Sequence, residues 1–231
     1  MDTGQNQHIL IQASDLTIGY PGRVICGPIS LEIGAGAGLG VIGVNGSGKS
    51  TLVQTILGAL PSLGGTVAYK GRELNENSLE FRQNVAVQAS DGAFFEELTV
   101  AEHLEMTARG HGLASWKSKV GRELEFFDLQ DQAQNLPSEL SSGQRRKLLL
   151  AATLIRPAQI LILDEPEQRL DVKIRQRLYD RLGEYRRDSV AILAVTHDPM
   201  MLRSCLDEAF LMDSDQGQLM AAAHGAQWLE R

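Results

Sequence analysis

A glycine-rich stretch, "GVNGSGKST", runs from Gly43 to Thr51 between an apolar segment and a predicted helix. It fits the pattern G-x-x-x-x-G-K-[ST], and its position between a strand and a helix is the context that a phosphate-binding loop requires. Glycine lets backbone N–H groups approach phosphate oxygens without a Cβ in the way, and the following helix adds its positive N-terminal end. The lysine is expected to reach the β- and γ-phosphates of a nucleotide, and the first hydroxyl after it to bind Mg²⁺. The residues expected to hold the nucleotide are Gly43, Asn45, Gly46, Ser47, Gly48, Lys49, Ser50 and Thr51.

An acidic pair, Asp164 and Glu165, follows the apolar run "ILIL". If that run is a buried parallel strand, the two acids lie at the sheet edge where ligands bind. Asp164 is suited to hold Mg²⁺, and Glu165 to polarise the water that attacks the γ-phosphate. The alternative is a pair of solvated turn residues without a ligand.

A second stretch, "LSSGQRRK", also has the features of an anion site. Ser141 is predicted to be a helix N-cap, with Gln144 three residues later completing a capping box. The backbone N–H groups of Ser142 and Gly143 then face outward at the positive end of a helix. The alternative is a plain helix start, and the residues from Arg145 to Lys147 are predicted to form the solvated face of that helix.

Four further residues are weak signals when each is taken alone. Tyr20 could stack on an adenine ring or be an ordinary half-buried aromatic, and Gln88 could bind Mg²⁺ or cap a turn. Asp171 is either a helix N-cap or a functional acid. His197 ends an apolar run, where a neutral imidazole could bind a γ-phosphate or be a satisfied structural residue.

The elements that must position these residues alternate in the order of an α/β fold. Three short strands are predicted in residues 8–42, a helix from Lys49 towards Pro61, a hairpin with a strand from Thr66 to Tyr69, and a strand that ends at Gln88. Helical spacing then extends over residues 91–157. The apolar runs "QILILD" and "VAILAVT", joined by a helix from Val172 to Arg187, indicate buried parallel strands with a right-handed crossover.

The composition limits the classes of protein that fit. With 231 residues and 43 % hydrophobic content, the chain is expected to form one compact domain. A net charge of −7 argues against a nucleic-acid partner. Cys26 and Cys205 have no metal-site spacing and are interpreted as free thiols. We expect neither a signal peptide nor a membrane span, so any membrane function requires a partner.

Taken in order, these residues resemble the nucleotide-binding subunits of ATP-binding-cassette (ABC) transporters over nearly the whole chain. The family's aromatic residue matches Tyr20, its Walker A motif Gly43 to Thr51, and its Q-loop Gln88. Its signature matches Leu140 to Gln144 and its Walker B motif Ile160 to Glu165. Its D-loop matches Asp171 and its H-loop His197. The resemblance implies an α/β fold: a P-loop NTPase (RecA-like) core with an N-terminal antiparallel β subdomain and an inserted α-helical subdomain. A single domain over 1–231 would divide into a core of 1–88 and 157–231 and a helical subdomain of 89–156.

The resemblance also implies ATP and Mg²⁺ as cofactors and a head-to-tail dimer. Each signature would cap the ATP held by the other chain, so that Ser141, Ser142, Gly143, Gln144 and Asp171 would join the nucleotide site across the dimer. The catalytic residues would be Lys49, Glu165 and His197. The residues that bind the metal ion would be Ser50, Gln88 and Asp164.

The sequence departs from the family pattern at two places. Ser142 replaces a glycine of the usual L-S-G-G-Q, and Gln168 and Arg169 replace the small residues that usually precede Leu170 and Asp171. A homodimer with two hydrolytic sites is expected, and a heterodimer with a related cassette is the alternative.

The partners implied by the resemblance are separate transmembrane permease subunits, which would hold the chain at the cytoplasmic face of the membrane. Phe94, Phe95 and Leu98 could contact a membrane-side helix or pack within the helical subdomain's own core. The pattern resembles exporter cassettes more than importer cassettes, and import remains the alternative. A soluble ABC ATPase of translation or DNA maintenance usually carries paired cassettes, a coiled coil or zinc cysteines, and a non-catalytic cassette would lack Lys49 or Glu165.

Overall fold

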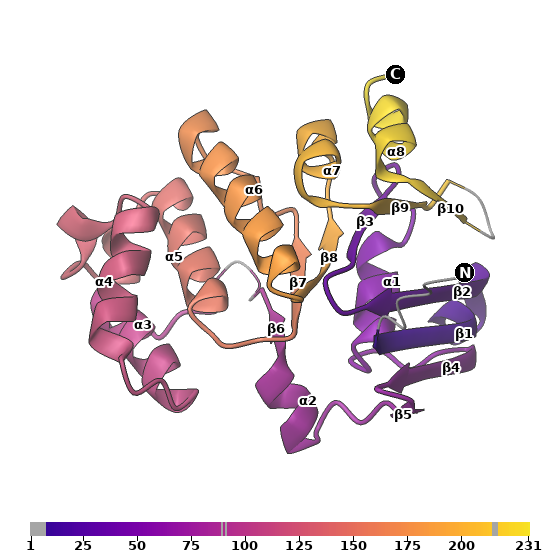
Figure 1. The fold of residues 1–231 in the computed structure, drawn as a ribbon, viewed down its shortest axis with the longest axis horizontal. Coiled ribbons are helices and arrows are strands. Elements are labelled where there is room, and N and C mark those ends of the chain that lie inside the picture. Colours follow the sequence, from indigo (N-terminus) through magenta and orange to yellow (C-terminus); the bar gives the residue numbers. More distant parts are fainter. Residues whose placement is uncertain (1–7, 89, 91, 214–216) are drawn as a thin grey trace, which may run out of the picture.

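The described residues form two β-sheets, one antiparallel and one mostly parallel. The computed structural model describes residues 8–88, 90, 92–213 and 217–231 (Figure 1). One sheet is antiparallel, in the order β2-β1-β4-β5. Its strands are β1 (Ile9–Tyr20), β2 (Arg23–Gly34), β4 (Gly64–Tyr69) and β5 (Arg72–Glu73). The second sheet has the order β10-β9-β3-β8-β7-β6, in which all neighbours run parallel except the edge strand β10.

The strands of the second sheet are β3 (Gly38–Ile42), β6 (Val85–Val87), β7 (Ile160–Asp164), β8 (Ala191–Val195), β9 (Glu208–Leu211) and β10 (Gln218–Ala221). The inner strands β3, β7 and β8 are short and apolar, as expected for strands covered on both faces. Successive side chains of a strand point to opposite faces. Accordingly, Ile160 and Ile162 of β7 pack with the antiparallel sheet and α1 (Lys49–Ile56), whereas Leu161 and Leu163 pack with the remaining helices.

Between β6 and β7 the chain forms a helical unit. It contains α3 (Val100–Gly110), α4 (Trp116–Phe126), two 3₁₀ turns (Gln130–Gln132 and Pro137–Glu139) and α5 (Ser142–Leu154). A capping box between Thr99 and Glu102 starts α3. In Figure 1 this unit lies at one end of the molecule and the antiparallel sheet at the other. The fold is therefore the predicted P-loop NTPase architecture with an antiparallel β part and an inserted helical part.

Several details of the fold differ from the sequence-based expectation. The helix after the phosphate loop ends at Ile56, well before Pro61, and Gly58 takes a positive φ of 75° just beyond it. α6 (Val172–Arg187) has the predicted bounds. The sequence did not predict the short α2 (Leu79–Asn84) or the elements beyond His197, which are β9, β10, α7 (Pro199–Cys205) and α8 (Ala222–Leu229).

Within the described part of the chain, no helix combines the length and apolar character needed to cross a bilayer. Cys26 and Cys205 are both buried thiols outside any disulfide, and burial raises the pKa of Cys205 to about 12. The interpretation of both cysteines as thiols without a disulfide is confirmed.

Candidate nucleotide-binding site

The phosphate loop joins β3 to α1, as its sequence predicts. The Lys49 ammonium lies beneath the loop, where it donates to the carbonyl oxygens of Gly43 (2.9 Å) and Val44 (3.0 Å). Burial lowers the pKa of Lys49, while the carboxyl groups of Glu165 and Asp164 act in the opposite direction. The side chain is thus held at the point where a phosphate group would replace the two carbonyls as its partner.

Two glycines of the loop are required by the backbone. Gly43 and Gly48 have φ values of 146° and 99°. A Cβ would lie 2.5 Å from the carbonyl oxygen of Met212 at Gly43, and 2.4 Å from Cγ2 of Ile25 at Gly48. The loop therefore packs against the polypeptide on its outer side, and its N–H groups are left to line the inner side.

The acidic pair lies at the carboxyl end of β7, beside the end of β8. Glu165 is held in the left-handed region (φ 45°), and its N–H donates to the Val195 carbonyl at 2.9 Å. Nε2 of His197 lies 3.3 Å from Oε1 of Glu165. Burial raises the pKa of the Asp164 carboxyl, and the neighbouring Glu165 raises it further. The fold therefore brings the two acids and the histidine together, as the order of the motifs predicted.

Gln88 lies directly after β6 and reaches the same acids. Its Nε2 donates to the backbone oxygen of Asp164 at 2.9 Å, and its Oε1 is buried with no hydrogen-bond partner. Ser50, Gln88 and Asp164 line one cavity of about 490 Å³ together with Glu165. An orphaned amide oxygen, a hydroxyl and a carboxylate are oxygen ligands of the type that Mg²⁺ takes, and a cation would offset the repulsion that raises the pKa of Asp164.

The described residues contain no cluster of three His, Cys, Asp or Glu that could hold a metal by itself. Mg²⁺ commonly binds through one or two protein groups and completes its shell with water and substrate phosphates. The residues present therefore fit a metal that arrives with its nucleotide.

Tyr20 ends β1 at the mouth of the phosphate loop. It is 48 % exposed and lines a cavity of about 670 Å³ together with Ser47, Lys49 and Glu165. The loop residue Ser47 also has a buried hydroxyl with no partner. An exposed aromatic ring beside a phosphate loop with an unpartnered hydroxyl has the arrangement that a nucleotide base and its phosphates require.

The predicted second anion stretch has the expected local geometry but a different location. The Ser141 hydroxyl accepts from the Gln144 N–H (3.3 Å), and the Gln144 side chain accepts from the Ser141 N–H (2.8 Å), so the capping box is confirmed. Residues 140–144 line neither of the two cavities beside the phosphate loop. In Figure 1, α5 and α1 lie on opposite sides of strands β7 and β8.

Asp171 belongs to this second group of residues. It is the N-cap of α6, accepting from the Ile174 N–H at 2.9 Å, and its other oxygen lies 3.3 Å from Nζ of Lys147 on α5. A Cβ at Gly143 would lie 3.0 Å from the carbonyl oxygen of Arg169. The start of α5 and the loop before α6 thus form one surface, separate from the chain's own phosphate loop.

The prediction that Arg145 to Lys147 form a solvated face is wrong for Arg146. This side chain is 7 % exposed, and its guanidinium donates to the backbone oxygens of Asp164 (2.6 Å) and Glu165 (2.5 Å). Arg146 therefore ties α5 to the acidic pair. The position of an arginine one turn into a helix gives no signal of this contact, because its partners are backbone atoms of a distant strand.

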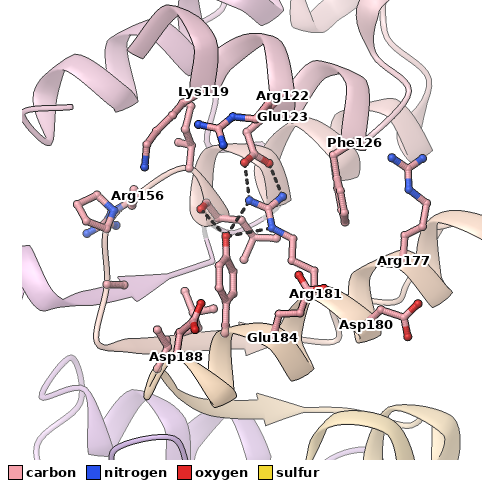
Figure 2. A pocket seen from close by; sticks show the side chains of 17 residues that line it. Lys119, Arg122, Glu123, Phe126, Arg156, Arg177, Asp180, Arg181, Glu184 and Asp188 are labelled. Atoms are coloured by element: carbon pink, nitrogen blue, oxygen red, sulfur yellow. Dashed lines mark hydrogen bonds and ion pairs between the residues drawn. The ribbon is translucent and has the colours of Figure 1, made fainter. Parts of the chain in front are cut away.

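A further cavity, of about 710 Å³, lies away from the phosphate loop, at the junction of α4 and α6. Figure 2 shows that Arg181 of α6 and Glu123 of α4 face each other across it. Nη1 of Arg181 donates to Oε2 of Glu123 at 2.7 Å, and Nε of Arg181 lies 3.0 Å from the Tyr185 hydroxyl. The ion pair between Arg181 and Glu123 lines this cavity and connects α4 of the helical unit to α6.

Comparison with known proteins gives a consistent result. A family model described as ABC transporter matches residues 26–168. The chain is 30 % identical to an uncharacterized ABC transporter ATP-binding protein, y4fO, of Sinorhizobium fredii, over 82 % of this chain and 56 % of that protein. It is 31 % identical to a Nod factor export ATP-binding protein of Cupriavidus pinatubonensis (77 % of this chain, 55 % of that protein). It is also 31 % identical to a sulfate/thiosulfate import ATP-binding protein of Mesostigma viride (80 % and 54 %). The chain thus spans about half the length of these relatives.

Among solved structures, an ATP-binding subunit of an ABC transporter superposes with a TM-score of 0.84 at 24 % identity, covering 96 % of this chain and 93 % of that one. At this identity the likeness bears on the fold.

Proposed function

Because the chain belongs to the ABC transporter family as one of its ATP-binding domains, we propose that it binds Mg·ATP at the phosphate loop and hydrolyses it to drive separate membrane subunits. The observation that carries this proposal is the convergence of Lys49, Glu165 and His197 beside the orphaned oxygen of Gln88. We further propose that residues 89–156 act as a helical subdomain on a core formed by 1–88 and 157–231.

Each residue of the site has a role that follows from its position. Lys49 exchanges its two carbonyl partners for the β- and γ-phosphates, and the Tyr20 ring stacks on the base. Ser50, Gln88 and Asp164 hold Mg²⁺, which neutralises phosphate charge when bound. Held 3.3 Å from His197, Glu165 orients the attacking water and accepts its proton.

The second anion stretch requires a second copy of the chain. Within one chain, residues 140–144 do not reach the phosphate loop's cavities, yet a capped helix start with outward N–H groups is suited to an anion. A head-to-tail dimer places this surface, with Asp171 beside it, over the ATP of the partner. We propose two such composite sites in a homodimer.

Mixing two inactive variants tests the head-to-tail arrangement. Lys49→Ala removes the phosphate contact of one chain, and Ser142→Glu places a negative charge where the γ-phosphate of the partner would lie. Ser142 is exposed at the first position of α5, where an acid is compatible with the helix. Each variant alone should lose most of its ATPase activity. An equal mixture should regain part of it, because one of the two sites in each mixed dimer combines an intact phosphate loop with an intact Ser142.

Leu79→Glu is the matched control, because Leu79 is also an exposed first residue of a helix and lies outside both cavities. This variant should retain full activity alone. If mixing the two inactive variants restores no activity, two copies of this chain do not form the proposed pair.

The surface we propose for the permease subunits is a cavity of about 380 Å³ between the segment after Gln88 and α3. Phe95 is 56 % exposed there and lies beside His103, whereas Phe94 packs partly against the helical core, and Leu98 does not line the cavity. A membrane-side helix bound at this position would contact both Phe95 and Val87, the residue before the proposed metal ligand Gln88. Docking here would place the chain at the cytoplasmic face of the membrane.

We propose export as the direction of transport, on the sequence pattern of residues 97–112 and 140–166; relatives named for export and for import match equally well. The test is purification of the tagged chain from detergent-solubilised membranes, followed by reconstitution with the membrane subunits that accompany it. ATP added on the side of this chain should then drive cargo towards the opposite side. Movement towards the ATP side would indicate an importer, and recovery of ribosomes or DNA instead of a membrane protein would contradict transport.

A further inference from the structure

A second buried glutamate, Glu167, lies two residues beyond Glu165 and is 9 % exposed. Its Oε1 accepts a hydrogen bond from the Thr196 hydroxyl at 2.6 Å and from the backbone N–H of His197 at 3.2 Å. Its Oε2 is buried without a hydrogen-bond partner. The side chain thus faces the polypeptide that carries His197, and none of the cavities beside the phosphate loop is lined by it.

The segment around His197 is held from its other side by Asp198. The Asp198 N–H donates to the Thr196 hydroxyl at 2.9 Å, so this hydroxyl links the two acidic residues. Asp198 in turn accepts from the Tyr179 hydroxyl (2.7 Å) and lies 3.4 Å from Arg175, both on α6. The N–H of the Thr196–His197 peptide is therefore bound by Glu167 from the loop after β7, and the carboxylate of the next residue, Asp198, is held by side chains of α6.

We propose that Glu167 is a positioning residue for hydrolysis, which sets the direction of the His197 side chain by binding the N–H of His197 and the hydroxyl of Thr196. This inference rests on the role proposed for His197 above. The orientation of a peptide plane determines where the following Cα–Cβ bond points, and the imidazole must reach Glu165 over only 3.3 Å. A misplacement of about 1 Å in a catalytic group can cost about 100-fold in rate.

The alternative is that Glu167 has a purely structural role. Burying a carboxyl group has a free-energy cost, which argues against that role. Burial raises the pKa of the Glu167 carboxyl, although the hydrogen bonds from Thr196 and His197 act against this. A buried acid with one unpartnered oxygen stabilises the fold less than an apolar side chain of the same size would. The hydrogen bonds from Thr196 and His197 both come from the segment that carries His197, as a positioning role requires.

Glu167→Met tests the proposal, because methionine keeps the volume and removes both acceptor interactions. We expect kcat for ATP hydrolysis to fall about 10-fold, while KM for ATP and the affinity for a fluorescent ATP analogue change less than about 2-fold. Glu167→Gln retains an acceptor oxygen and should restore kcat to within about 2-fold of the wild type. In a His197→Ala background, Glu167→Met should cause no further loss.

Glu123→Met is the matched control, since Glu123 is another buried glutamate in a bonded pair remote from the phosphate loop. It should lower the melting temperature and leave kcat unchanged, which separates lost stability from lost positioning. Wild-type kcat in a folded Glu167→Met protein, or an equal loss with and without His197, would overturn the proposal. If His197→Ala alone hydrolyses ATP normally, the role of His197 fails, and that result is distinct from a failure at Glu167.

Discussion

At the scale of single residues, the site holds two charges whose pKa values are shifted by partial loss of hydration before any nucleotide arrives. Lys49 is 7 % exposed and its pKa is lowered by burial, and the pKa of Asp164 is raised for the same reason. Each charge lacks the partner that would compensate its lost hydration fully. In the proposed complex, Mg·ATP would supply both partners, a phosphate for the lysine and a cation for the acid, and its binding energy would be concentrated at these two side chains.

Lys49→Ala should therefore weaken ATP binding by about 100-fold, which corresponds to about 2.7 kcal/mol, within the range of hydrogen bonds to charged groups. Titration with a fluorescent ATP analogue measures the effect. Lys70→Ala, which removes a pair between the turn after β4 and Glu80 of α2, is the control and should bind ATP normally. Unchanged affinity in Lys49→Ala would remove the phosphate-loop assignment.

Glu165→Gln should keep ATP affinity within about 3-fold and reduce hydrolysis at least 100-fold, because the amide orients a water but does not accept its proton. Unhydrolysed ATP then holds the two composite sites closed, so the variant should elute as a dimer in Mg·ATP and as a monomer without nucleotide. Light scattering during gel filtration measures this. A variant that stays monomeric with Mg·ATP at high protein concentration would contradict the capping role of residues 140–144.

At the scale of elements, α5 connects the proposed dimer surface to the chemistry of the chain that carries it. Its first turn presents Ser141 to Gln144 outward, and one turn later Arg146 binds the backbone of the acidic pair. Movement of α5 on contact with a partner's ATP would therefore be transmitted to Asp164 and Glu165. Two substitutions on α5 test this connection, one at Ser142, which replaces the usual glycine, and one at the buried Arg146.

Ser142→Gly restores the glycine that is usual at this position and should preserve or raise ATPase activity, up to about 3-fold. Ser142 is exposed and takes helical geometry, so no backbone strain requires or forbids glycine there. The cost is a lower helix propensity of about 0.5–1 kcal/mol at a helix end, which a melting curve would detect. A large loss of activity would assign a specific contact to the Ser142 hydroxyl.

Arg146→Met removes the two hydrogen bonds to the carbonyl oxygens at the end of β7 and keeps most of the buried stem. The free energy of unfolding should fall by about 2–3 kcal/mol, because buried acceptors lose a charged donor. Hydrolysis should fall more than ATP binding, since the acids shift while the phosphate loop is untouched. Denaturant unfolding and ATPase assays measure the two effects, and Arg145→Met serves as the less buried control.

At the scale of the whole molecule, the helical unit and the parallel sheet are joined by packing and by the pair of Glu123 and Arg181 (Figure 2). Both side chains are largely buried, with side-chain exposures of 6 % and 17 %. Removing one partner from such a pair leaves an uncompensated buried charge, which typically costs about 3–5 kcal/mol.

Glu123→Ala should accordingly lower the free energy of unfolding by about 3 kcal/mol with kcat at saturating ATP retained. The double variant Glu123→Leu with Arg181→Met removes both charges and should recover most of the loss, since an apolar pair of similar volume avoids the desolvation cost. Denaturant titration of the three proteins measures the difference. Equal stability of Glu123→Ala and the wild type would show that the two layers are joined by apolar packing alone.

The sequence alone determined the helix starts and strands that depend only on residues close to one another in the chain. The glycine pattern before Lys49, the capping box from Ser141 to Gln144 and the apolar runs of β7 and β8 are local, and each predicted its element correctly. Short elements near the carboxyl end were missed, because α7 and β9 span only seven and four residues and are formed by contacts with β3 and α6.

Only the tertiary structure decided which distant residues meet. It placed Arg146 against the end of β7 and Glu167 against the His197 segment, and it separated residues 140–144 from the phosphate loop of the same chain. The contacts of Arg146 and Glu167 join a side chain to backbone atoms of residues 18 to 30 positions away. Because every residue carries the same backbone atoms, the residue type of the partner does not reveal such a contact. The residue types of this protein therefore specify its chemistry, whereas the packing of its strands and helices determines which of those residues can act together.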